Sequence, residues 1–151
     1  MIAAAGGEWK LRVARELGAD EAVDYTEPAW TERMRGGVDV VFDGVGGAVG
    51  RAAFELVRPG GRFLAFGLAS GTFTDVSEPD AARRGVTVIR GMRLEPEKLR
   101  ELSRAALAEA EAGRLRPLIG QTFPLERAAK AHAAIEARAT VGKTLLLVDT
   151  R

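Results

Sequence analysis

Glycines gather in a short stretch, VDVVFDGVGGAVG, that runs from residue 38 to residue 50. An apolar run precedes Gly44, Gly46 and Gly50, and a helical pattern follows the first two. Glycines between a strand and a helix let a phosphate group approach the helix N-terminus, as in dinucleotide-binding turns. Val49 stands where that spacing requires the third glycine, and no acidic residue ends the next strand. Two interpretations stay open: a phosphate cradle or, the one we favour, a tight turn against a cofactor edge or a neighbouring strand.

Other kinds of chemistry are restricted by the residue types present. The chain has no cysteine and a single histidine, His132, which cannot build a zinc site alone. No serine stands in a pattern typical of nucleophilic catalysis. Asp43 is interpreted as a turn former whose carboxylate accepts hydrogen bonds from backbone N–H groups. We therefore predict no catalytic side chain and no metal ligand in this chain.

Composition narrows the class of protein further. Of the 151 residues, 46% are apolar and 28% are charged, and the formal net charge is +1. That balance gives no indication of nucleic-acid binding. No apolar run is long enough to span a membrane, and the opening residues do not have the pattern of a signal peptide. We expect a globular, cytoplasmic protein with no nucleic-acid or membrane partner.

Apolar strands alternate with amphipathic helices along the chain. Helices are predicted over residues 8–17, 27–35, 48–58, 96–112 and 125–138, and a short helix after the capping pattern of Ser77 and Asp80. In the long helix Leu99 and Leu102 are expected to face inward, with Ala106 and Ala110. Strands are predicted over residues 2–5, 22–24, 38–42, 62–66, 86–90 and 144–148. This alternation predicts an α/β fold of Rossmann type, a parallel sheet with helices on both faces.

The order of these segments resembles the C-terminal part of the medium-chain dehydrogenase/reductase superfamily, in its zinc-free quinone oxidoreductase branch. The segments that carry the resemblance are IAAAGGEWKLRVARELGADEAVDY, GVDVVFDGVGG, LVRPGGRFLAFGLASG and FPLERAAKAHAAIEARATVGKTLLLV. The resemblance implies a partial nucleotide-binding domain over residues 1–113 and a tail, 114–151, that packs on a catalytic domain. It also implies that the sheet's first strand and glycine-rich loop should precede residue 1, so we expect a truncated chain.

The resemblance further implies an NADPH site without naming a catalytic side chain. Lys10 would contact the 2′-phosphate, since Ala5 stands where NAD-preferring relatives carry an acid. Tyr25 would lie beside the adenine. Arg90, Gly91 and Met92 would line the nicotinamide pocket, and Lys143 is a weaker candidate. The full set of predicted cofactor-binding residues is Gly6, Gly7, Lys10, Tyr25, Gly44, Val45, Phe66, Gly67, Arg90, Gly91 and Arg138.

The favoured function is the cofactor-binding part of an NADPH-dependent quinone or enone oxidoreductase, inactive as this fragment. Its small-molecule substrate would accept a hydride from the cofactor. Two alternatives stay open. LVRPGGRFLAFG also resembles the sheet of AdoMet-dependent methyltransferases, although the tail lacks their closing antiparallel pair. The chain could equally be a folded remnant without catalysis.

The Rossmann strand order leaves a position empty in this chain. Strands 2–5 and 38–42 should flank the missing first strand across about two strand spacings, roughly 9.6 Å. Open strand edges promote association. A second copy, direct pairing of the two strands, or strand 144–148, expected to lack partners of its own, could fill the position. We therefore expect a homodimer.

Overall fold

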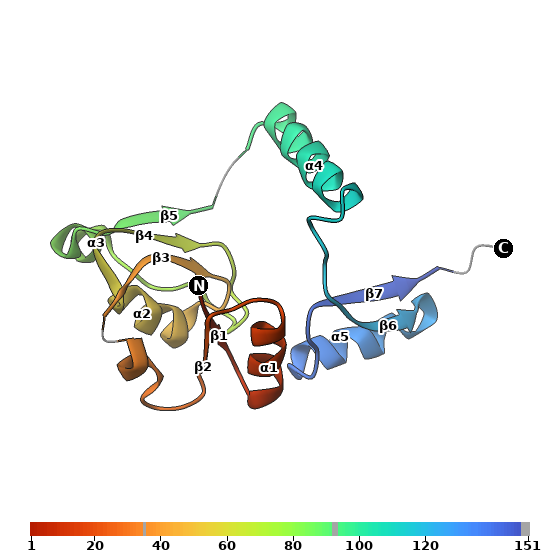
Figure 1. Ribbon diagram of the computed structural model, residues 1–151, viewed down its shortest axis with the longest axis horizontal. Coiled ribbons are helices and arrows are strands. Elements are labelled where there is room, and N and C mark those ends of the chain that lie inside the picture. Colours follow the sequence, from red (N-terminus) through yellow and green to blue (C-terminus); the bar gives the residue numbers. More distant parts are fainter. Residues whose placement is uncertain (35, 92–93, 149–151) are drawn as a thin grey trace. The chain divides into compact units, whose positions relative to one another are not determined.

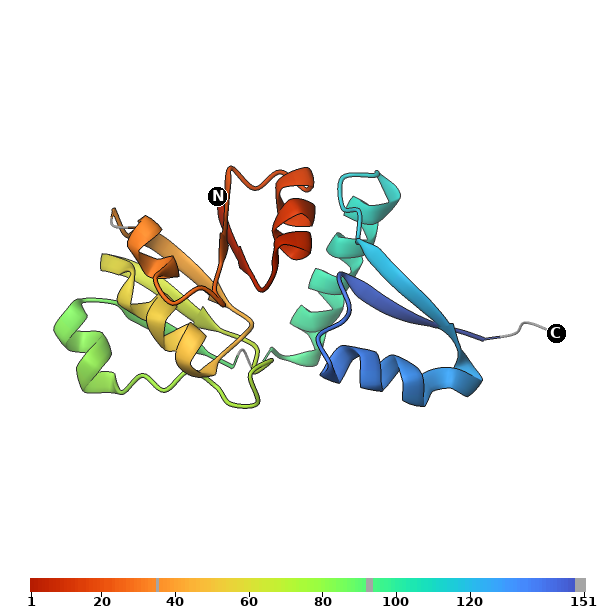
Figure 2. The same cartoon turned by 90° about the horizontal axis from the view of Figure 1, so that it is seen from below.

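The computed structural model describes residues 1–34, 36–91 and 94–148. Its contacts divide the chain into two compact units, Met1–Arg93 and Leu94–Arg151. This division falls earlier than the functional boundary predicted at residue 113, so the long helix groups with the tail. Whether the boundary at residue 113 separates two functional parts stays a prediction. Figures 1 and 2 show the elements of each unit.

The first unit contains two small parallel sheets. In chain order its elements are β1 (Ile2–Ala5), α1 (Glu8–Glu16), β2 (Glu21–Asp24), the 3₁₀ helix η1 (Trp30–Met34), β3 (Val38–Asp43), α2 (Gly47–Glu55), β4 (Val57–Ala65), α3 (Glu78–Arg84) and β5 (Thr87–Arg90). β1 pairs with β2, and the second sheet has the order β3-β4-β5. All these pairings are parallel, which confirms the predicted α/β class.

Two hydrophobic clusters hold the first unit together. Phe54 of α2 packs edge-on against Phe63 of β4, with ring centroids 5.6 Å apart, and neither side chain is exposed to solvent. This cluster places α2 and α3 against one face of the β3-β4-β5 sheet (Figure 1). The second cluster joins Val23 of β2 and Trp30 and Met34 of η1 to the side of α2. η1 and α2 thus connect the two sheets.

The second unit contains two parallel strands packed against one of its helices. Its elements are α4 (Pro96–Glu111), β6 (Ile119–Pro124), η2 (Leu125–Arg127), α5 (Ala128–Glu136) and β7 (Lys143–Leu147). β6 and β7 are parallel neighbours, and α5 lies along them (Figure 2). The sequence analysis missed β6 and expected the last strand to lack a partner. That expectation was wrong, because β7 is paired over its length with β6.

Several predicted boundaries need correction. The helix expected over residues 48–58 ends at Glu55, because Val57 already pairs with Val38 in the sheet. β4 therefore runs through Pro59-Gly60-Gly61 as a bulged segment and stops at Ala65, one residue before the predicted end. The predicted helix over 27–35 is η1, and residue 35 lies outside the described residues.

The long helix α4 confirms its predicted span but not its predicted burial. Leu99 is 54% exposed and Leu102 is 42% exposed, and no described residue of α4 is buried. The amphipathic pattern correctly indicated a helix, but no described element of the second unit covers its apolar face. Within the described residues, no helix has the length and apolar character needed to cross a membrane.

Candidate functional site

The candidate site begins where β3 ends, at Asp43. The main-chain oxygen of Asp43 accepts hydrogen bonds from the N–H groups of Phe66 (3.0 Å) and Gly67 (3.1 Å), which follow β4. Its carboxylate oxygen Oδ1 accepts from the N–H groups of Val45 and Gly46, both at 2.9 Å. This confirms Asp43 as a turn former. It also brings the predicted cofactor residues of two neighbouring turns, 44–45 and 66–67, side by side.

Glycines are required here because the two turns are in close backbone contact. A Cβ atom added to Gly67 would overlap the main-chain oxygen of Gly44 and lie 2.7 Å from its Cα atom. A Cβ added to Gly44 would lie 3.1 Å from the ring of Phe66. Gly46 has a φ of +75°, and a Cβ there would overlap the main-chain oxygen of Thr72. The glycines after β3 therefore serve packing against residues 66–74.

The same packing argues against a phosphate cradle at the start of α2. The Asp43 carboxylate already accepts two N–H groups just ahead of this helix, where an incoming phosphate would need donors. A second negative charge there would be repelled by the first. Gly50 lies against the Asp43 carboxylate as well, because a Cβ added to it would lie 2.5 Å from Asp43 Oδ2. The geometry supports our favoured interpretation of a tight turn against a neighbouring segment.

An apolar cleft of about 540 Å³ opens beside these turns, at the carboxyl ends of β4 and β5. Leu64 of β4 and Ile89 of β5 are register partners on its floor, and Phe66 and Phe73 stand exposed at its edge. The residues that line it are Leu64, Ala65, Phe66, Phe73, Ile89, Arg90 and Gly91. Carboxyl ends of parallel strands are where α/β sheets bind ligands. Three of these seven residues, Phe66, Arg90 and Gly91, were predicted from the sequence, whereas Leu64, Ala65, Phe73 and Ile89 were not.

Arg90 contributes the charged side chain of the cleft, but it also has a structural partner. Its guanidinium donates a hydrogen bond to the main-chain oxygen of Val76. This bond ties β5 to the segment that precedes α3. Met92, predicted to join the same pocket, lies outside the described residues.

A second group of predicted residues surrounds the turn after β1. A Cβ added to Gly6 would lie 3.2 Å from the ring of Tyr25, so the two are in contact. The N–H of Gly7 donates to the carboxylate of Asp24 at 2.9 Å. The hydroxyl and N–H of Thr26 donate to the other oxygen of that carboxylate, and these bonds, with that from Gly7, lower the pKa of Asp24. The sequence analysis missed Asp24, which holds the two turns together.

Two predicted residues lie apart from these turns along the chain. Lys10 is partly buried in the first turn of α1, three residues after Gly7. Arg138 belongs to the second unit and follows α5 with a φ of +54°, the left-handed region that non-glycine residues rarely adopt. Its predicted contact with the cofactor stays a prediction.

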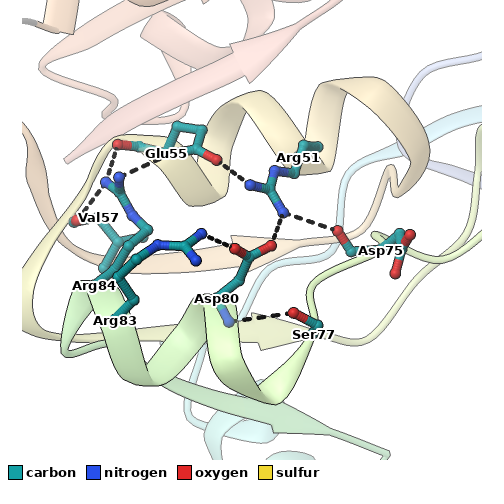
Figure 3. A network of polar contacts seen from close by, with 8 residues as sticks. All are labelled: Arg51, Glu55, Val57, Asp75, Ser77, Asp80, Arg83 and Arg84. Carbon is teal, nitrogen blue, oxygen red and sulfur yellow. Dashed lines mark hydrogen bonds and ion pairs between the residues drawn. The ribbon is translucent and has the colours of Figure 1, made fainter.

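A network of ion pairs and hydrogen bonds joins α2 to α3 (Figure 3). Arg51 of α2 contacts Asp80 of α3 at 2.9 Å and donates to the main-chain oxygen of Asp75 at 3.4 Å. The hydrogen bond from Arg51 lowers the pKa of Asp80 below its ordinary value. As predicted, Ser77 caps α3 by accepting the N–H of Asp80. These contacts fix the end of the 66–77 segment against α2.

Comparisons with known proteins agree with this geometry. A family described as zinc-binding dehydrogenase matches residues 17–146. The chain belongs to that family. It is 34% identical over 148 residues to a quinone oxidoreductase from Pseudomonas aeruginosa, covering 91% of the chain and 46% of the relative. These relatives confirm the predicted place in the quinone oxidoreductase branch of the medium-chain dehydrogenase/reductase superfamily.

Solved structures give the same result. The Escherichia coli quinone oxidoreductase complexed with NADPH superimposes with a TM-score of 0.83 at 27% identity, over 97% of this chain and 49% of that one. A mycobacterial protein complexed with NADPH superimposes with a TM-score of 0.84 at 28% identity, over 97% of this chain and 49% of that one. The fold is therefore of Rossmann type, as predicted. The chain spans about half the length of the curated relatives it matches.

The family's description names zinc, but this member does not offer residues that fit the metal. The sequence lacks cysteine and has one histidine. Among the residues that the structure describes, no three His, Asp or Glu side chains gather as a metal-binding group.

Proposed function

We propose that this chain forms the nucleotide-binding part of an NADPH-dependent oxidoreductase that reduces quinones or enones. The observation that carries the proposal is the contact between turns 44–45 and 66–67 at the carboxyl ends of adjacent parallel strands, beside an apolar cleft. When bound, the cofactor supplies a hydride to an electron-poor carbon or a quinone. The protein's task is to position both partners and to exclude water.

Each turn has a distinct part in this proposal. Gly44 and Val45 lie against a ribose. Phe66, Gly67, Arg90 and Gly91 surround the nicotinamide, where the apolar floor of the cleft favours a flat ring over water. The adenosine end of the cofactor lies at Gly6, Gly7 and Tyr25.

A preference for NADPH rests on charge at the first turn. Ala5 ends β1 without a carboxylate that could hold the ribose hydroxyls or repel a 2′-phosphate. Lys10 stands one helical turn after Gly7 and supplies a positive charge. The carboxylate of Asp24 is occupied by Gly7 and Thr26, so it acts on the turn rather than on a ribose.

Titration with half-ligands tests this assignment without requiring catalysis. The chain should bind 2′,5′-ADP about tenfold more tightly than 5′-AMP, a difference worth about 1.4 kcal/mol. Lys10→Glu should remove that difference, whereas Lys130→Glu, the same charge reversal on α5, should keep it. Equal affinity of the unaltered chain for both nucleotides would refute the NADPH preference. Tighter binding of S-adenosylmethionine than of either would favour the methyltransferase alternative.

Turnover belongs to a larger protein in this proposal. We expect no measurable turnover from the 151-residue chain, because the relatives it matches are about twice as long. We also propose a homodimer, because β1 and β3 each have one strand partner among the described residues and so keep an open edge, and a cytoplasmic location.

A further inference from the structure

We propose that Asp43 and Thr74 form a positioning pair that sets the nicotinamide-binding turn against its neighbour. The Thr74 hydroxyl donates a hydrogen bond of 2.5 Å to Asp43 Oδ2. The inference rests on the proposed function and assigns residues that the sequence analysis did not place in the site. Both are positioning residues, since neither lines the cleft.

Burial marks this pair out from the other polar residues. Asp43 is 5% exposed and Thr74 is 4% exposed, and within the described chain they are the two buried polar side chains. A buried carboxylate is costly unless each oxygen accepts hydrogen bonds. Here Oδ1 has two backbone donors and Oδ2 has Thr74. Losing the Thr74 hydroxyl would leave Oδ2 without its donor and drive the carboxylate to move.

Movement of Asp43 would reach both cofactor turns. Five hydrogen bonds converge on this residue, three on its carboxylate and two on its main-chain oxygen. The three carboxylate bonds involve residues 45, 46 and 74, and the two main-chain bonds hold Phe66 and Gly67. A shift of Asp43 would therefore change the spacing between Gly44 and Gly67, which are already in backbone contact.

The 66–77 segment depends on such anchors because few of its side chains are buried. Leu68 is 46% exposed and Phe73 is 57% exposed. Beyond Thr74 the segment is fixed by Arg51 at Asp75 and by Arg90 at Val76 (Figure 3 shows the first). Segments with little burial open at low free-energy cost. Phe66 and Gly67 join the start of the segment to the main chain of Asp43, and Thr74 joins its later part to the Asp43 side chain.

The test compares three variants of the chain with two ligands. Thr74→Val keeps the shape of the side chain and removes the hydroxyl, whereas Thr74→Ser keeps the hydroxyl. Thr72→Val is the matched control, because it makes the same threonine-to-valine change at an exposed position of the same segment. NADPH spans both parts of the site, whereas 2′,5′-ADP carries the adenosine end and no nicotinamide. Affinities are measured by nuclear magnetic resonance titration to millimolar ligand, and the dispersion of the amide signals reports folding.

Thr74→Val should weaken NADPH binding about fivefold or more, because a hydrogen bond to a charged group is lost. It should leave 2′,5′-ADP within about twofold, and Thr74→Ser and Thr72→Val should bind both ligands within about twofold. Should Thr74→Val fail to fold, Thr74→Ala, which also removes the hydroxyl and leaves Asp43 Oδ2 without this donor, is expected to give the same selective loss.

Unchanged NADPH affinity in the folded valine variant would overturn the positioning role. Equal losses for both ligands, or an equal loss in the serine variant, would also overturn it, because they indicate general destabilisation. Failure of the unaltered chain to bind either ligand would instead refute the proposed function, and this inference with it.

Discussion

Substituting Gly50 by alanine separates the two explanations of the glycine-rich stretch. In an ordinary helix the change would stabilise by about 1 kcal/mol. Gly50 lies in α2, however, and a Cβ there would overlap Thr74 Oγ1 and lie 2.5 Å from Asp43 Oδ2. Overpacking costs about 1–3 kcal/mol, and a lost hydrogen bond to a charged group about 1.5–3 kcal/mol. We expect a net destabilisation of about 2–4 kcal/mol.

Urea unfolding followed by tryptophan fluorescence reports the stability of the unit that contains Gly50, because Trp9 and Trp30 both lie in Met1–Arg93. Gly36→Ala is the matched control, since its nearest neighbour, Arg58, is 3.7 Å from the added Cβ. It should change stability by less than about 0.5 kcal/mol. In a Thr74→Ala background, Gly50→Ala should cost at least about 1 kcal/mol less, because the clashing oxygen is gone. A stabilised Gly50→Ala chain would refute the packing explanation and revive the phosphate cradle.

Three further predictions concern other parts of the chain. Arg138→Gly should stabilise the second unit by about 1 kcal/mol, because glycine adopts positive φ without strain; urea unfolding followed by circular dichroism measures this. Arg138→Ala should not stabilise the unit. Equal effects of the two substitutions would show that loss of the arginine side chain, and not relief of backbone strain, causes the change in stability. Asp80→Asn should destabilise the chain at pH 7, and the difference should vanish as the pH falls through the lowered pKa of Asp80, below its ordinary value of 3.8; a difference that persisted at lower pH would remove the ion pair as its cause. The chain should sediment as a dimer, because β1 and β3 each have one strand partner among the described residues; a monomer at tens of micromolar protein would contradict this.

Local patterns were sufficient to predict most of the first unit. Apolar runs located β1, β3 and β5 to within a residue, and the Ser77 cap located α3, because both depend on residues close in sequence. β6 was missed because IGQTFP has a glycine, a proline and a mostly exposed surface. It is a strand because β7 pairs with it, and such long-range pairing leaves no local signal.

In the candidate site, too, some residues could be predicted from local sequence patterns and others could not. Gly44 and Gly67 follow strands, so their place at the carboxyl edge could be predicted from the sequence. Thr74 could not, because it lies in an irregular segment that only the fold brings to Asp43. The glycine spacing left a phosphate cradle and a tight turn both open, and the structure explains it by contacts within the protein. Sequence alone does not distinguish a backbone that must approach a phosphate from one that must approach another backbone.

Titration of the nitrogen-15-labelled chain with NADPH, followed through its amide signals, shows whether the strand-end turns bind a dinucleotide. We expect weak binding, because the Asp43 carboxylate already occupies the N–H groups at the start of α2. The largest shifts should fall at Gly6, Gly7, Gly44, Val45, Phe66 and Gly67, with no comparable shifts in Ile119–Pro124. No response at several millimolar NADPH, or a response confined to the second unit, would contradict the claim that these strand-end turns form a dinucleotide site.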